Sequence, residues 1–457
     1  MLEGTVKKFL YELKWRLHHP AAFEKYRRLL ANETASLDEL LARQEAARQR
    51  IVRTAMTKTA FYPKFYGAVG FETGDIGQEG WFERLPLVTK KELREQRDSF
   101  VNPEKKASLR WFTTGGSTGE PVKTGFDESL CEEVYNWRLL NRFGVHPWDN
   151  HAYLWRDLRP RRIAKLVNAA MWWPTRHLKC DVSSLDDAGI RAFLENCRRI
   201  RPALIYGYVG ALSQVARFVL DRFGKFGEGL GGSEAWRPKL VWATSAPLSV
   251  VLRKMIETAF GAPVCDEYGS CECRWLACQC PECKGLHVNV EHVHLEFLGE
   301  NGRPVEKGAY GRTVITNLED EVFPLIRYEN NDRGRWLGEP CPCGRTLPCI
   351  DSVKGRESES FVLPSGKVIS GEYLTTLFDA HPDLVRGFRV VQHRDASITV
   401  EYVPSKKSKI EVEGEQRMTA ALSGFMRIVD GEVPVVFKPV QEIPHDRGKL
   451  RFVVREK

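Results

Sequence analysis

The chain contains 457 residues, of which 42% are hydrophobic and 28% charged, a composition that excludes a mostly disordered protein and supports at least one large core. Its formal net charge is +8, which suits an anionic ligand, but no long Lys/Arg stripe favours a nucleic-acid-binding protein. No run of about 18 apolar residues appears, so no transmembrane segment is predicted.

The N-terminal segment, up to about residue 66, is predicted to be mainly helical. Its first helical pattern leaves two interpretations open: a helix packed on its own domain, which is favoured, or a basic helix that touches a membrane surface. A second helix is predicted to begin after Ser36, whose side chain can cap it, with Glu39 three residues later. The first pattern comprises apolar Leu2, Val6, Phe9, Leu13 and Leu17, beside basic Lys7, Lys8, Lys14 and Arg16.

Further along the chain, short apolar segments alternate with amphipathic helical patterns. This order of strand, helix and strand predicts an α/β architecture with largely parallel sheets. The predicted strands include 151–155, 202–208, 239–246 and 312–318, and the predicted helices include 185–200 and 248–260.

After Cys349 the pattern changes to alternating strand-like segments around a polar helix. We therefore predict a large domain over 1–354 and a small α+β domain over 355–457, with the junction near Lys354–Glu359. The large domain then contains nearly every motif described below.

One loop has the composition of a phosphate-binding turn. Small hydroxyl residues and glycines let the backbone approach a polyphosphate, whose oxygens accept bonds from the N–H and O–H groups. The segment does not fit the Walker pattern, and by itself a plain turn explains it equally well. Its residues are Thr113, Thr114, Gly115, Gly116, Ser117, Thr118 and Gly119, followed by Glu120 and Pro121.

Nine of the 12 cysteines lie between Cys265 and Cys349, in a chain without an apolar signal core at its N-terminus. This clustering indicates reduced thiols in the cytoplasm rather than disulfides. Two short groups, 278–283 and 341–344, have the spacing of a tetrahedral zinc site, and a set of buried thiols is the alternative.

The Thr/Ser/Gly loop resembles the signature loop of the adenylate-forming superfamily, which includes acyl- and aryl-CoA ligases and luciferases. Two positions depart from the usual pattern: Gly116 replaces a hydroxyl residue, and Glu120 stands where lysine is common. Four further segments resemble superfamily motifs in the same order along the chain. They are Glu267-Tyr268-Gly269-Ser270-Cys271-Glu272, Pro324–Tyr328 with Asp332, Gly355-Arg356, and Gly448-Lys449.

The resemblance implies roles for five residues of these four segments. Tyr268 would lie along the adenine, Glu272 would bind Mg²⁺, and Asp332 would accept bonds from both ribose hydroxyls. Arg356 would lie near the ribose or phosphate at a domain hinge, and Lys449 would be the catalytic lysine. Taken singly, these residues can also be surface or turn residues.

Within the superfamily the chain is most similar to the phenylacetate–CoA ligase type and its relatives near polysaccharide genes. Fragments such as 59–62, 81–90, 202–208, 285–287 and 341–346 extend the resemblance over nearly the whole chain. It implies a large domain of stacked mixed sheets with helices, and a small mobile α+β domain. It also implies a structural zinc ion in the cysteine region, held by Cys280, Cys283, Cys341 and Cys343, with His287 as the substitute for Cys283.

The acid substrate is expected to meet apolar and aromatic walls on strand ends before Tyr268, and ordinary core packing is the alternative for each residue there. The residues concerned are Tyr206, Tyr208, Trp242 and Ala246.

The predicted activity is ATP- and Mg²⁺-dependent conversion of a carboxylic acid to its acyl-AMP, followed by transfer to CoA in the cytoplasm. One alternative is transfer to an amine or a carrier protein, and a remote one is a basic zinc protein that binds nucleic acid. The acid and the oligomeric state are not predicted.

Overall fold

The computed structural model describes most of the chain. The described residues are 2–113, 123–155, 170, 172–182, 185–224, 236–282, 284–353, 361–369, 374, 377–378, 384–405, 418, 422–446 and 449–456. The predicted phosphate loop at 114–119, Cys283 and Arg356 lie outside them, and the side chains of Thr113 and Lys449 are likewise not described.

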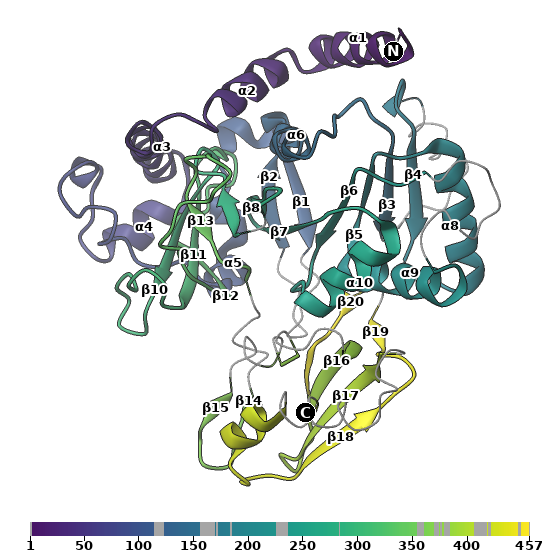
Figure 1. Cartoon of the computed structure of the whole chain (residues 1–457). Coiled ribbons are helices and arrows are strands. Elements are labelled where there is room, and N and C mark those ends of the chain that lie inside the picture. Colours follow the sequence, from purple (N-terminus) through teal and green to yellow (C-terminus); the bar gives the residue numbers. More distant parts are fainter. Residues whose placement is uncertain are drawn as a thin grey trace. The chain divides into compact units, whose positions relative to one another are not determined.

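The N-terminal segment is helical, as predicted, and appears in purple in Figure 1. Ser36 caps the third helix by accepting a hydrogen bond from the backbone N–H of Glu39, 3.3 Å away, so the predicted cap is confirmed. The helices are α1 (Leu2–His18), α2 (Pro20–Ala31), α3 (Leu37–Lys58), α4 (Phe61–Gly67) and α5 (Lys90–Gln96).

The chain divides into two compact units. Unit 1 contains residues 1–14, 140–266 and 354–457, and unit 2 contains residues 15–139 and 267–353. The last boundary falls at the predicted junction, and residues 354–457 group with 140–266. The division into domains 1–354 and 355–457 stays a prediction.

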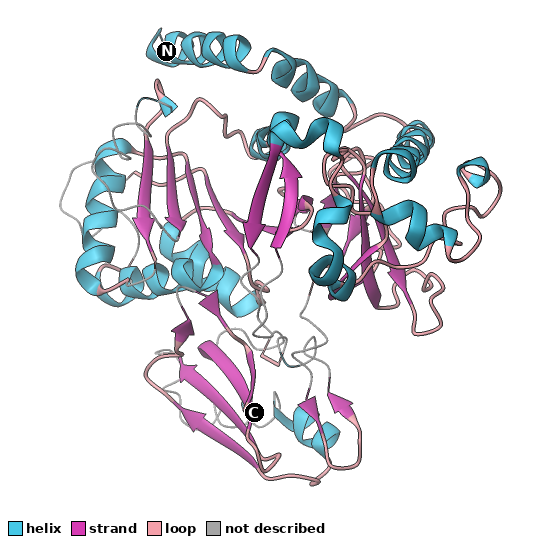
Figure 2. Cartoon of the chain, turned by 180° about the vertical axis from the view of Figure 1, so that it is seen from behind, coloured by secondary structure: helices cyan, strands magenta, loops and turns pink. Residues whose placement is uncertain are grey.

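A parallel sheet forms the centre of unit 1, in the order β7-β6-β5-β3-β4. One face packs on three helices, because alternate strand residues such as Ala152, Ile205 and Val241 join their apolar side chains in one core. Figure 2 shows these helices in cyan beside the magenta strands. The elements are β3 (His151–Trp155), β4 (His177–Asp181), β5 (Leu204–Tyr208), β6 (Leu240–Thr244), β7 (Val264–Ser270), α8 (Asp187–Ile200), α9 (Val209–Arg222) and α10 (Val250–Phe260).

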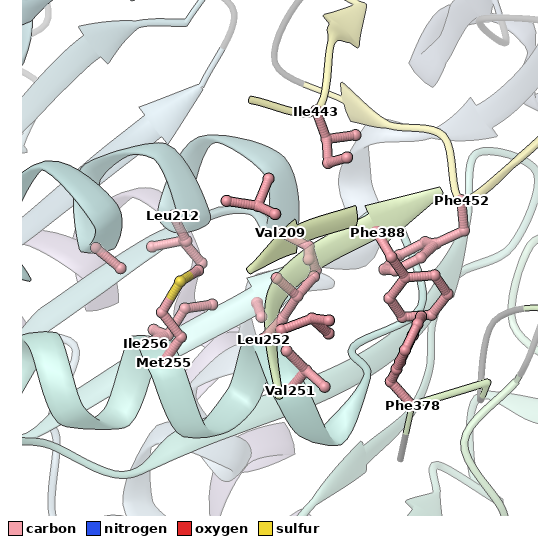
Figure 3. Packing of buried hydrophobic residues seen from close by; sticks show 14 of the residues in the cluster. Val209, Leu212, Val251, Leu252, Met255, Ile256, Phe378, Phe388, Ile443 and Phe452 are labelled. Atoms are coloured by element: carbon pink, nitrogen blue, oxygen red, sulfur yellow. The ribbon is translucent and has the colours of Figure 1, made fainter. Parts of the chain in front are cut away.

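The C-terminal part of unit 1 contains a four-stranded sheet in the order β18-β17-β16-β21. Phe388 of β16 and Phe452, the residue before β21, belong to the same core as Val209 of α9 and Leu252 of α10 (Figure 3). Two further pairs of strands, β14-β15 and β19-β20, lie in the same part of the chain. All strands of this part are β14 (Phe361–Val362), β15 (Val368–Ile369), β16 (Val385–Gln392), β17 (Ile398–Pro404), β18 (Val435–Pro439), β19 (His445–Asp446), β20 (Lys449–Leu450) and β21 (Val453–Arg455).

Unit 2 contains antiparallel sheets, since β1 pairs with β2, β11 lies between β10 and β12, and β8 lies between β9 and the end of β7. The mixture of parallel and antiparallel sheets with helices confirms the predicted α/β fold. The elements are β1 (Leu109–Thr113), β2 (Lys123–Asp127), α6 (Glu133–Arg142), which ends in unit 1, β8 (Arg274–Gln279), β9 (Leu286–Val288), β10 (Val293–Leu298), β11 (Gly311–Asn317), β12 (Tyr328–Gly334) and β13 (Cys349–Ile350).

Candidate functional site

Strand β12 presents three polar residues on one face. Tyr328, Asn330 and Asp332 alternate with more exposed neighbours and are all buried, as the two-residue period of a strand requires. The predicted ribose-binding carboxylate, Asp332, therefore lies in a row with a phenol and an amide. Asn330 was not singled out from the sequence, although its position two residues before Asp332 places it on the same face.

Tyr268, near the end of β7, is bonded to this row. Its hydroxyl donates to Oδ2 of Asp332 at 3.0 Å and accepts from Nδ2 of Asn330 at 2.8 Å. Asn330 also donates to Asp332 Oδ2 at 2.7 Å. Burial, followed by the charge of Asp332, raises the pKa of Tyr268 well above its ordinary value, so the hydroxyl keeps its proton.

Glu272, the predicted magnesium ligand, follows β7 in the turn to β8. The hydroxyl of Tyr328 donates to its Oε1 at 3.0 Å. Burial, followed by the charge of Glu272, raises the pKa of Tyr328 well above its ordinary value. Two phenols thus orient the two predicted carboxylates, and the segment 267–272 is joined to β12 twice.

The start of β12 is fixed by two residues whose roles were not predicted. The hydroxyl of Tyr62 accepts from the backbone N–H of Ile326 at 3.1 Å and donates to the carbonyl of Pro324 at 2.9 Å. The guanidinium of Arg327 forms two bonds with Glu296, at 2.9 and 3.1 Å, and donates to the carbonyl of Glu83 at 2.9 Å. Both lie in fragments that carry the family resemblance, and this was the available signal.

The predicted phosphate loop joins β1 to β2, two strands that pair antiparallel with Thr113 opposite Lys123. Arg274, two residues after Glu272, connects this hairpin to the turn. Its guanidinium lies 3.6 Å from the ring centre of Phe126 and 5.0 Å from that of Phe112. It also pairs with Glu132 at 3.2 Å, a side chain that is only 4% exposed. Sequence reasoning missed Arg274.

The predicted acid-binding residues lie in unit 1. Tyr206 and Trp242 sit opposite each other on β5 and β6, with ring centres 4.7 Å apart. Trp155, which was not predicted, packs against Tyr206 at 5.2 Å and Tyr208 at 4.4 Å. Ala246 follows β6 and packs against the unit 1 core. The structure thus brings the three predicted aromatic residues together through Trp155.

Four of the five predicted metal-binding residues gather in unit 2, and the fifth is Cys283, which is not described. One ligand atom from each of Cys280, His287, Cys341 and Cys343 lies within 4.8 Å of every other. Cys280 Sγ is 3.5 Å from Cys341 Sγ, and Cys343 Sγ is 3.4 Å from His287 Nε2. Ligands of a tetrahedral zinc ion are separated by roughly 3.4–3.8 Å, so the residues fit that ion.

The orientation of His287 also suits a metal. Its Nδ1 lies 3.1 Å from the carbonyl oxygen of Leu347, which can accept a hydrogen bond from Nδ1–H, and its Nε2 is directed at Cys343. Cys349 Sγ lies 3.3 Å from the same Nδ1, and Cys349 packs against Cys280 and Cys341, but it is not one of the four residues whose ligand atoms gather. His287 is completely buried.

The fold is that of adenylate-forming ligases. A crystal structure of 2-hydroxyisobutyryl-CoA ligase in the postadenylation state with R3-HIB-AMP matches with a TM-score of 0.73 and 19% identity, over 93% of this chain and 91% of that one. An open conformation of that ligase with 2-HIB-AMP and CoA matches with a TM-score of 0.62 and 20% identity, over 93% of each chain. The amide bond synthetase McbA from Marinactinospora thermotolerans matches with a TM-score of 0.50 and 16% identity, over 76% of this chain and 68% of that one.

The sequence is similar to two curated proteins. Phenylacetate-coenzyme A ligase from Escherichia coli strain K12 is 24% identical over 344 residues, which are 72% of this chain and 74% of that protein. Protein CapK from Staphylococcus aureus is 23% identical over 253 residues, 54% of this chain and 53% of that protein. No profile of a known protein family matches the chain. The predicted resemblance to the adenylate-forming superfamily, of the phenylacetate–CoA ligase-like type, is confirmed.

Proposed function

We propose that this chain activates a carboxylic acid with ATP and transfers the acyl group to coenzyme A. The observation that carries the proposal is the pair of phenol–carboxylate bonds that joins Tyr268 to Asp332 and Tyr328 to Glu272. The similarity to phenylacetate-coenzyme A ligase, over 74% of that protein, supports the same chemistry and confirms the predicted class of adenylate-forming ligase.

In the first step, an oxygen of the substrate carboxylate attacks the α-phosphorus of ATP. The bond from that phosphorus to the pyrophosphate oxygen breaks, and acyl-AMP and pyrophosphate form. Glu272 would hold Mg²⁺, which when bound would supply positive charge at the phosphate oxygens. Lys449 stabilises the charge that develops on the α-phosphate, and Asp332 orients the ribose through its hydroxyls.

The other predicted residues position the substrates. The backbone and hydroxyl groups of Thr113–Gly119 donate to the phosphates, and the ring of Tyr268 lies along the adenine. Tyr206, Tyr208 and Trp242, with Ala246, form walls for the acyl group, and we add Trp155 to this set because it contacts two of them.

In the second step, the thiol sulfur of CoA attacks the acyl carbonyl carbon and loses its proton to solvent. The bond from that carbon to the AMP oxygen breaks, and AMP leaves as the phosphate anion. Movement of residues 355–457 about the junction near Arg356 would withdraw Lys449 and admit the thiol. 2-Hydroxyisobutyryl-CoA ligase has been observed both in a postadenylation state and in an open conformation with 2-HIB-AMP and CoA, so that protein adopts more than one conformation.

We further propose that Cys280, His287, Cys341 and Cys343 bind a structural zinc ion. A site closed by four protein ligands leaves no position for substrate, so the ion would act by holding the ends of β8 and β9 to the 341–344 turn. A cytoplasmic location is part of the same proposal, because ATP, CoA and reduced thiols occur there.

The test is acid-dependent pyrophosphate release. The protein is incubated with ATP, Mg²⁺ and a panel of aryl and aliphatic acids, with and without CoA. Release that needs an acid, together with a thioester product when CoA is present, supports the proposal. Release that needs an acid but gives no thioester points instead to an amine or carrier-protein acceptor. Salt-sensitive nucleic-acid binding without nucleotide turnover would contradict it.

A further inference from the structure

Helix α1 exposes an apolar row to solvent. Among the described residues thirteen large apolar side chains are exposed, and four of them lie on this helix. The exposed fractions are 54% for Val6, 63% for Phe9, 45% for Leu13 and 74% for Leu17. Spacings of three and four residues place these side chains on one face, over a length of about 16 Å.

The opposite face of α1 is attached to the protein. Tyr11 is buried, with only 2% of its surface exposed. Lys7 Nζ donates to Asn150 Oδ1 at 2.7 Å, and Lys14 Nζ donates to the carbonyl of Trp173 at 3.1 Å. The helix therefore directs two cations inward and its apolar row outward, which is the reverse of the usual arrangement on a globular surface.

The first 31 residues of the chain are positively charged. Residues 1–31 contain seven Lys and Arg against three Glu, which is a formal charge of +4 out of +8 for the whole chain. Lys8 and Arg16 on α1, and Arg27 and Arg28 on α2, are exposed. A fifteenth of the chain thus carries half of its net charge.

We propose that α1 docks this protein on the surface of an anionic phospholipid membrane. An apolar row beside exposed cations has the chemistry of a helix that lies in the headgroup region of a bilayer, with its apolar side chains inserted and its cations at lipid phosphates. A second copy of the chain fits less well, since pairing two such rows would also bring Arg16 of each copy close to that of the other. The searched residues contain no helix long and apolar enough to cross a bilayer, so α1 would lie on the membrane.

The experiment measures binding of the full-length protein to vesicles, and no carboxylic acid substrate is added. Vesicles of phosphatidylcholine with about 30% phosphatidylglycerol should bind it at least tenfold more tightly than phosphatidylcholine alone, and added salt should weaken the binding. The double variant Phe9→Ser/Leu13→Ser should lose at least about tenfold in vesicle affinity. Leu41→Ser is the matched control, because Leu41 on α3 is 45% exposed, like Leu13, and its loss should leave binding unchanged.

A second variant keeps the test independent of effects on folding. Lys8→Glu/Arg16→Glu retains the apolar row and should remove the preference for phosphatidylglycerol. Equal binding to both vesicle types, or unchanged binding by the Phe9→Ser/Leu13→Ser variant, would overturn the proposal. So would a dimer in equilibrium sedimentation that dissociates in that variant without any vesicle binding by the parent protein. Pyrophosphate release by the variants in solution is measured separately, so failure of the proposed activity can be distinguished from failure of the membrane proposal.

Discussion

The phenolic hydroxyl of Tyr268 donates a hydrogen bond to Oδ2 of Asp332 at 3.0 Å, and both side chains are buried. This bond connects the end of β7 to β12, strands that are separated by more than fifty residues of sequence. Asn330 donates to both partners, so the carboxylate is fixed by two donors. A carboxylate held in this way is preorganised to accept further donors, such as the two hydroxyls of a ribose.

Replacement of Asp332 by asparagine should weaken ATP binding. The amide keeps the shape but loses the charge that strengthens hydrogen bonds from ribose hydroxyls, a loss of about 1.5–3 kcal/mol. We expect the KM for ATP in pyrophosphate release to rise at least about tenfold. Glu300→Gln is the control, because that carboxylate is 76% exposed and pairs only at the surface with Arg333. An unchanged KM in Asp332→Asn would remove the ribose assignment.

The helices and strands on the one hand, and the main site residues on the other, were predicted from different features of the sequence. The strand at 151–155 followed from its short apolar run and the helix at 185–200 from its amphipathic pattern, since the placement of apolar residues reports burial directly. Tyr268, Glu272 and Asp332 came from the family resemblance. Their mutual arrangement was not predictable, because it depends on how β7 and β12 pack, and sequence spacing contains no information on contacts between distant strands.

The sequence did not reveal residues that support the site by holding other side chains in place. Arg274 looks like an ordinary surface cation in the sequence, yet it is enclosed by Phe112, Phe126 and Glu132. Its function as a connector follows only from the fold. The proposed metal ligands show an intermediate case, because cysteine spacing indicated a metal site but could not choose between Cys283 and His287.

Replacement of Lys449 by alanine should slow adenylation without preventing ATP binding. If this lysine stabilises the charge on the α-phosphate by about 3–4 kcal/mol, the rate of pyrophosphate release should fall ~10²–10³-fold. Lys438→Ala is a suitable control, because Lys438 on strand β18 is also a lysine of the C-terminal part and is exposed. Full adenylation by Lys449→Ala would show that another residue has this role.

Replacement of Arg274 by methionine should destabilise the protein by about 2–3 kcal/mol. The change leaves Glu132, a buried carboxylate, without its cationic partner, and this penalty exceeds the lost contact itself. Urea denaturation of the single variant and of Arg274→Met/Glu132→Gln measures it. The double variant should recover part of the loss, because the second change removes the unpaired charge. Equal stability of Arg274→Met and the parent protein would contradict the pairing.

The cysteine cluster should contain about one zinc ion per chain. Cys341→Ser and His287→Ala should lose the ion, and both should unfold at lower urea concentration. Cys349→Ala is the matched control: Cys349 is also buried and touches His287, but from the Nδ1 side, so that variant should keep its zinc. Elemental analysis of reduced protein decides the outcome.

Cys283→Ala identifies the fourth ligand. Retention of zinc in this variant supports His287, which the structure places with the other three residues. Loss of zinc in Cys283→Ala, with retention in His287→Ala, would exchange the two assignments. A metal-free parent protein prepared under reducing conditions would reject the site altogether.

Stability should fall as the pH decreases from about 6.5 towards 4, in a window set by buried histidines. Burial lowers the pKa of His151 to about 4, and that of His294 to about 3, from an ordinary value of 6.5. In this window the unfolded chain binds protons at these residues and the folded chain does not, so the free energy of unfolding rises with pH. Each histidine contributes at most about 1.4 kcal/mol per pH unit. Urea denaturation across the window measures the slope, which His151→Gln should reduce. An equal slope in His151→Gln and the parent protein would show that His151 is protonated in the folded state.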